Sequence, residues 1–215
     1  MTREIIRRTI GACALAAGLL GAVSCGDVAR QGRSPGFLII DSLTAASGAS
    51  PNEFGNVLYS DVQTLVDQQV NGETVRVPTV YSDLGRVSLR LGLKNPGTTV
   101  NPTQPTTINE ITITRYHVAF ERADGRNTPG IDLPYGFDGG ATVTVGAASS
   151  VSMGFDLVRH QMKEEPPLRN LINSGGANLI STIATITFYG RDQAGNDVEA
   201  SGKMTVNFGD FGDPQ

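Results

Sequence analysis

The sequence predicts an all-β fold, an antiparallel β-sandwich with one short helical crossover near residues 167–173. Three observations support this prediction. Several segments alternate apolar and polar residues, which is the period-two pattern of a half-buried strand. Turn residues separate these segments. Helical spacing is confined to residues 160–173, where Pro166 and Pro167 rule out one continuous helix.

The strand signals before residue 107 are short or uneven. Phe37–Ile40 and Val57–Tyr59 are brief apolar runs. Asn71-Gly72 separates two further segments and is a strong hairpin signal, because both turn residues need positive φ. Only residues 87–93 alternate cleanly, with the leucines on one face. A separate small β subdomain at 37–107 therefore stays open.

The strand signals after residue 107 are stronger and predict a main sandwich at 108–208 within a domain spanning 37–215. They comprise a long strand at 108–121, brief strand signal at 143–145, alternation at 151–157, and a final hairpin of 179–189 and 198–208. In the long strand, strict alternation would place Thr112, Thr114, Tyr116, Val118 and Phe120 on one side.

This series of about eight strands with little helix resembles immunoglobulin-like and fibronectin-like sandwiches. The likeness is architectural only. The chain has no Trp, so the Cys…Trp…Cys hallmark of antibody domains is absent.

Residues 1–24 have the layout of a signal peptide. Arg3, Arg7 and Arg8 precede an uncharged apolar run from Thr9 to Val23. That run has 15 residues, fewer than the roughly 20 that a helix needs to cross a bilayer core.

The end of the run, Ala22-Val23-Ser24-Cys25, resembles the lipobox of bacterial lipoproteins, although Leu and a small residue are commoner at the first two positions. The resemblance implies cleavage before Cys25, a lipid on its thiol, and residues 25–36 as a lipidated cysteine and polar tether. Ordinary secretion with a free Cys25 and an uncleaved anchor remain alternatives. Because Asp27 follows Gly26 rather than Cys25, the inner-membrane retention pattern is not met, and the outer membrane is weakly favoured.

The net negative charge limits the kinds of partner that the chain can bind. The full chain carries a formal net charge of -4, and removal of three Arg and one Glu with the leader leaves -6. A surface that binds nucleic acid needs clustered Lys and Arg, so we expect no nucleic-acid partner. We expect the membrane as one partner, through the lipid on Cys25, and an envelope protein or glycan as the other.

No pattern in the sequence predicts a catalytic, metal or cofactor site. Gly32-Arg33-Ser34-Pro35-Gly36 fits the serine-hydrolase pattern, but Pro35 has no N–H to donate to an oxyanion. His117 is expected to be a surface or cross-strand histidine. His160 and Glu164 have ligand spacing without a third ligand nearby. Asp192, Asn196 and Asp197 fit a tight turn better than a calcium loop.

The remaining candidates are contact residues. Tyr135 and Phe137 occupy an irregular segment and form a candidate contact loop, since interfaces are rich in aromatic residues. The sequence favours a non-catalytic structural, adaptor or binding module of the bacterial cell envelope. Two alternatives stay open. A glycan-binding module would need an exposed row among Tyr81, Tyr116, Tyr135 and Tyr189, and an envelope hydrolase would need paired carboxylates among Glu110, Glu121, Asp132 and Asp138.

Overall fold

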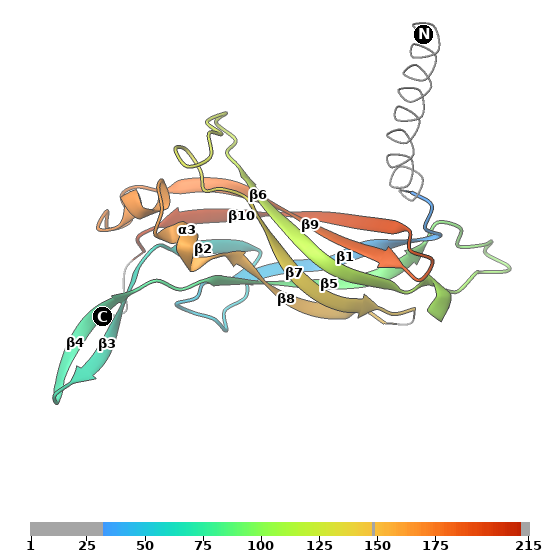
Figure 1. Ribbon diagram of the computed structural model, residues 1–215, viewed down its shortest axis with the longest axis horizontal. Helices are drawn as coiled ribbons and strands as arrows, with labels where there is room; N and C mark the ends of the chain where they lie inside the picture. The colour runs from blue at the N-terminus through green and yellow to red at the C-terminus, as the bar shows by residue number, and fades with distance from the viewer. Residues whose placement is uncertain (1–31, 148, 212–215) are drawn as a thin grey trace, which may run out of the picture.

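The computed structural model describes residues 32–147 and 149–211; Cys25 and the predicted signal peptide lie outside this range. Strands dominate the described chain (Figure 1). They are β1 (Gly36–Ala46), β2 (Val57–Asp61), β3 (Thr64–Val70), β4 (Glu73–Thr79), β5 (Asp83–Leu93), β6 (Ile111–Glu121), β7 (Phe137–Val145), β8 (Val151–Val158), β9 (Ile180–Asp192) and β10 (Asp197–Gly209). The helices are single turns, namely η1 (Thr107–Asn109), α3 (His160–Lys163) and η2 (Leu168–Leu171).

The strands form two larger sheets and one separate hairpin. One sheet has the order β1-β5-β8, and the other has the order β2-β10-β9-β6-β7. All pairs are antiparallel except β2 with β10, which run parallel. Both sheets combine strands from before and after residue 107. The all-β prediction is confirmed, with sheets that are antiparallel and mixed.

One hydrophobic core lies between the two larger sheets. Alternate residues of β5 and β9 are buried, and the sequence predicts this alternation for β5. Tyr116 on β6 and Phe155 on β8 bring the sheets together, with ring centroids 5.2 Å apart, and Phe188 on β9 packs against Phe155 at 5.4 Å.

The segment after β8 crosses between the sheets, as predicted. α3 ends at Lys163 and η2 begins at Leu168, so Pro166 and Pro167 interrupt the helical stretch as expected. Leu168 and Leu171 of η2 are buried in the core. The crossover is thus two short turns rather than one helix at 167–173.

The strict alternation predicted along β6 is wrong. The register shifts between Ile113 and Arg115, which indicates a β-bulge. Ile111 and Ile113 are therefore buried before the shift, and Tyr116 is buried after it, whereas the threonines in between face outward. An extra residue in one strand moves the inward face by one position, which alternation alone does not reveal.

The β3–β4 hairpin projects from one end of the elongated body, and we call it the arm (residues 62–82). Its turn residues Asn71 and Gly72 have φ values of 53° and 85°, in agreement with the predicted hairpin turn. The described chain begins with Gly32, and its first segment, drawn in blue before β1, lies at the opposite end (Figure 1). We call the end that carries the arm the far end, and the end that carries Gly32 the tether end.

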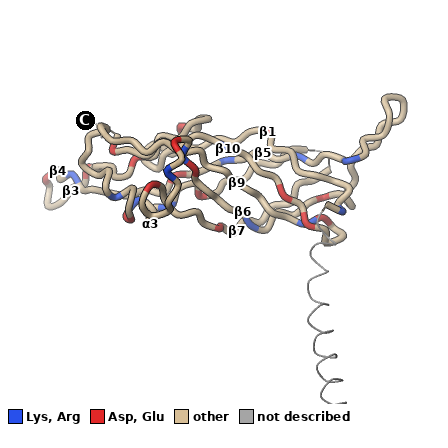
Figure 2. Tube along the Cα trace, turned by 90° about the horizontal axis from the view of Figure 1, so that it is seen from above, with Lys and Arg blue, Asp and Glu red and all other residues tan. Residues whose placement is uncertain are grey.

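The surface carries mixed charge. Acidic and basic residues are interspersed along the body rather than separated into faces (Figure 2). Among the described residues, no helix is long and apolar enough to cross a membrane.

Candidate functional site

The most unusual side chain in the described part of the molecule is Lys163, a lysine buried at the root of the arm. Its side chain is 1% exposed, and that of its partner Asp83 is 0% exposed. The Lys163 ammonium donates one hydrogen bond to the Asp83 carboxylate at 2.8 Å and another to the backbone carbonyl of Asp61, also at 2.8 Å. Asp61 precedes the arm and Asp83 follows it, so one ammonium group holds both stems together.

Two further contacts fix the same root. The Asp83 carboxylate accepts a hydrogen bond from the backbone N–H of Gly48 at 2.8 Å, which connects it to the loop after β1. The backbone N–H of His160 donates to the Ser82 hydroxyl at 3.0 Å. The arm is therefore attached to α3 at two adjacent residues of its returning stem.

Burial determines the electrostatics of this root. Loss of water raises the pKa of Asp83, and the charge and hydrogen bond of Lys163 act in the opposite direction. Burial also raises the pKa of Asp61, although its carboxylate accepts hydrogen bonds from the Thr64 hydroxyl and the Phe211 N–H. The hydrogen bonds from Lys163 and Gly48 both reach Oδ1 of Asp83, and they offset part of the hydration that the carboxylate loses on burial.

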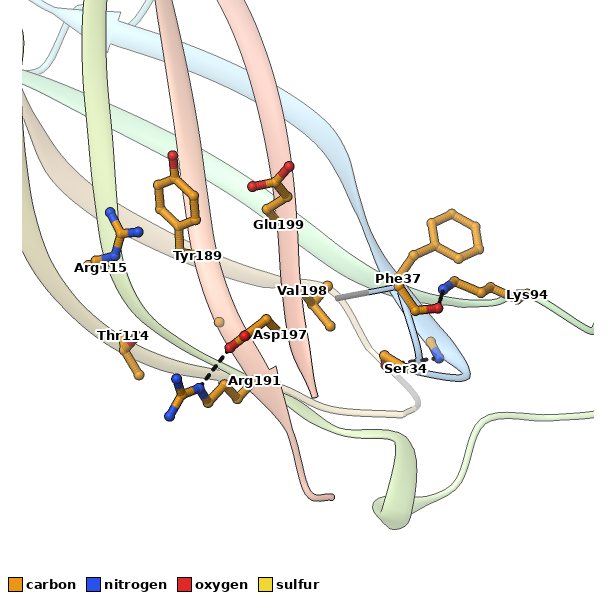
Figure 3. Close-up of a pocket in the computed structure, with 13 residues that line it drawn as sticks. Ser34, Phe37, Lys94, Thr114, Arg115, Tyr189, Arg191, Asp197, Val198 and Glu199 are labelled. Atoms are coloured by element: carbon orange, nitrogen blue, oxygen red, sulfur yellow. Dashed lines mark hydrogen bonds and ion pairs between the residues drawn. The ribbon is translucent and has the colours of Figure 1, made fainter. Parts of the chain in front are cut away.

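A groove of about 810 Å³ opens at the tether end, and we call it the tether-end groove (Figure 3). Its basic residues are already engaged with protein groups. Arg191 pairs with Asp197 at 2.8 Å, and the Lys94 ammonium donates to the Gly32 carbonyl at 2.8 Å. The Arg115 guanidinium lies 3.7 Å from the centre of the Tyr189 ring. The groove consequently presents mixed, mutually neutralised charge rather than a strong site for one ion.

Ser34, at the centre of the predicted Gly32–Gly36 motif, lies beside this groove. It is 2% exposed, and its hydroxyl accepts a hydrogen bond from the Gly36 N–H at 3.2 Å. Ser34 therefore stabilises the backbone where the chain enters β1. Residues 32–36 of the predicted tether thus lie against the body.

Tyr135 and Phe137, the predicted contact loop, lie in different environments. Tyr135 is 58% exposed. Phe137 begins β7, packs edge-on against Tyr116 with centroids 6.3 Å apart, and carries the Arg159 guanidinium over its ring at 4.0 Å. The two aromatic residues therefore differ in exposure and in partners.

The four tyrosines that a glycan-binding surface would need do not form a row. Tyr116 is buried in the core, where burial raises the pKa of its hydroxyl. The Tyr189 ring is covered by Arg115. Tyr81 is 36% exposed and follows β4, which places it on the arm.

The four carboxylates considered for hydrolysis lie at the two ends of β6, in the loop before β7, and at the start of β7. Glu110 and Glu121 flank the two ends of β6, about 35 Å apart at the usual rise of a strand. Asp138 is held by Arg115 at 3.2 Å and lies 3.3 Å from His117, the predicted cross-strand histidine. Asp132 accepts a hydrogen bond from the Thr128 N–H. None of the four lines the tether-end groove.

The other polar candidates have structural partners. The Asp192 carboxylate accepts hydrogen bonds from the backbone N–H groups of Ala194 and Asn196 and from the Asn196 side chain. Partial burial alone would raise the pKa of Asp192, but these bonds lower it. His160 lies 3.3 Å from the Ser82 hydroxyl through Nδ1. Across residues 32–147 and 149–211, no three His, Cys, Asp or Glu side chains are grouped to hold a metal.

Sequence reasoning missed Lys163 and Asp83. Lys163 stands beside Glu164 and Glu165 in a polar segment that resembles an exposed helix start. Its partner is distant in sequence, so no local pattern could indicate the pair. No family model, curated protein or solved structure matches this chain.

Proposed function

We propose that this chain is a lipid-anchored, non-catalytic adaptor of the bacterial cell envelope, which presents its far end to a partner. The lipid on Cys25 would attach the tether end to the membrane, with the outer membrane favoured. The proposed fold class is an immunoglobulin-like sandwich extended by the arm.

The observation that carries this proposal is the position and attachment of the arm. The arm lies opposite the end at which the described chain begins (Figure 1). Its strands β3 and β4 pair only with each other among the described residues. An isolated two-stranded hairpin is marginally stable in water, so its direction depends on its root. Lys163 and Asp83 supply a buried attachment that fixes that direction.

The arm also exposes groups that can contact a partner. Val70 and Val75 are 47% and 44% exposed near its tip. These valines offer apolar contact area, and both strand edges offer backbone hydrogen-bonding groups. An element that reaches away from the body with open edges is suited to a protein partner.

In-cell photo-crosslinking tests this proposal. A benzophenone amino acid replaces Val70 or Val75 in the arm, and Val100, which is 96% exposed at the tether end, serves as the control position. We expect a discrete protein adduct from the arm positions and none from Val100. Equal labelling from both ends would contradict an adaptor that presents its far end.

The anchor is tested in the same cells. Cys25→Ser should abolish incorporation of labelled palmitate and release the exported protein from the membrane fraction. Retention of label or of membrane association in this variant would contradict lipid attachment at Cys25.

A further inference from the structure

A second hollow lies at the far end, beside the root of the arm, and we call it the root cleft. It has a volume of about 410 Å³. The loop after β1 forms one wall, β2 forms another, and Phe211, two residues after β10, closes it. Its lining includes Glu53, Phe54, Val57, Tyr59, Asp61 and Phe211.

One side of the root cleft is an open strand edge. β2 pairs with β10 and has no second strand beside it among the described residues. Along β2, Val57 and Tyr59 are 40% and 60% exposed, whereas Leu58 and Ser60 are buried. An extended segment that added to this edge would bond to the β2 backbone and place alternate side chains toward the cleft.

The cleft is electronegative. Glu53 and Asp61 line it, and no Lys or Arg belongs to its described lining. Burial is the main cause of the raised pKa of Asp61, and repulsion from Asp210 adds to it in the same direction. A positive charge placed beside these carboxylates would be attracted to them. The nearest cations already have partners, and one of them, Arg86, lies at a wall of the cleft. Lys163 is buried on Asp83, and Arg86 lies over the Phe54 ring.

The aromatic walls suit the same kind of charge. Tyr59 and Phe211 meet edge to face with centroids 5.7 Å apart. Phe54 already holds the Arg86 guanidinium 3.9 Å from its ring centre, which shows that a cation is accommodated at this wall. Aromatic faces attract Lys and Arg through the ring quadrupole. The carboxylates and the aromatic rings of the cleft therefore both favour a cationic ligand.

We infer that the root cleft receives a Lys or Arg side chain of an extended partner segment that adds to the free edge of β2. This inference rests on the proposed adaptor function and names the partner chemistry at the far end. The strand edge supplies backbone affinity, and the cleft supplies selectivity for a cationic side chain.

The test uses a fluorescein-labelled peptide in which lysine alternates with threonine, and a matched peptide with glutamate in place of lysine. Fluorescence anisotropy measures binding of each to the purified full mature chain. We expect the lysine peptide to bind and the glutamate peptide not to bind. Equal binding of the two peptides, or no binding of either, would overturn the inference.

Matched variants locate the binding site. Tyr59→Ala should weaken binding of the lysine peptide about two- to fivefold, whereas Tyr135→Ala, at an equally exposed tyrosine, should not. Glu53→Gln should weaken it by a similar factor, whereas Glu73→Gln at the arm tip should not. Equal losses in cleft and control variants would indicate non-specific attraction to an acidic protein and would also overturn the inference.

The peptide assay requires neither lipid nor a cellular partner, so the two proposals fail separately. Loss of peptide binding with persistent arm adducts in cells refutes the root cleft alone. Absence of arm adducts refutes the adaptor function itself. Slower amide hydrogen exchange in β2 upon binding is the expected signature of strand addition, and unchanged exchange would refute that mode.

Discussion

Replacing Lys163 by methionine should destabilise the protein far more than any surface ion pair does. The change removes the ammonium from both stems of the arm and leaves the carboxylate of Asp83 at 0% exposure without its counter-charge. Breaking a buried pair in this way costs about 3–5 kcal/mol. The free energy of unfolding of an ordinary domain is about 5–15 kcal/mol, so the loss should be large and easily measured.

Urea denaturation of the wild type, Lys163→Met, Asp83→Asn and the double variant gives the assay. The matched control is Arg90→Met, which breaks the exposed pair with Asp41 and should cost less than about 1 kcal/mol. The double variant should be more stable than the sum of the single losses predicts, by at least about 1 kcal/mol, because it buries no unpaired charge. A Lys163→Met loss no larger than that of Arg90→Met would refute the reasoning.

The pH dependence of the Lys163→Met loss has a definite sign. Burial raises the pKa of Asp83 above its ordinary value of 3.8. The stability that its neutral form provides is therefore fully present below pH 3.8 and is lost as the pH rises through the folded-state pKa. Without Lys163, that pKa rises further. The deficit of the variant should therefore shrink as the pH falls, and urea titrations from neutral to acidic pH will measure it.

Three further predictions concern the body and the arm. Gly139→Ala should cost about 1–3 kcal/mol in urea denaturation, because its new methyl group would overlap the Tyr116 ring, whereas Gly140→Ala, with open space around it, should be nearly neutral. Asp192 has a lowered pKa, so its charged form stabilises the protein above pH 3.8, and this stabilisation is lost as the pH falls through the folded-state pKa. The melting temperature of Asp192→Asn should therefore fall less on acidification than that of the wild type. Gly72→Ala should speed amide exchange in the arm and leave the exchange of β9 unchanged, since φ is 85° at this turn and no other strand depends on it.

The sequence predicted those strands in which the local pattern and the tertiary environment agree. In β5, Val87, Leu89 and Leu91 are buried as alternation predicts, and Leu93 at the end of the strand is partly buried. The Asn71-Gly72 turn was equally predictable, since its two φ values are a local requirement.

The prediction failed where a distant residue determines the structure. Residues 137–142 resemble a loop because of two consecutive glycines, yet they belong to β7. Gly139 is needed there because the Tyr116 ring of the neighbouring strand leaves no space for a Cβ. The polar residues after Ile40 likewise obscured the second half of β1, which pairs antiparallel with β5 after a register shift between Ile40 and Ser42.

The root of the arm is the clearest case of this kind, and its chemistry indicates what it does. Apolar residues of similar volume could fill a buried space at no lower stability than an ion pair. They could not, however, fix two chain stems at once, because apolar contacts have no direction. Lys163 donates to Asp61 on one stem and to Asp83 on the other, which defines the separation and angle at which the arm leaves the body. The Lys163→Met, Asp83→Asn double variant separates these roles: it should recover part of the stability, while arm amides exchange faster and adducts at Val70 decline. Recovery of stability with unchanged arm protection would show that the pair serves packing alone.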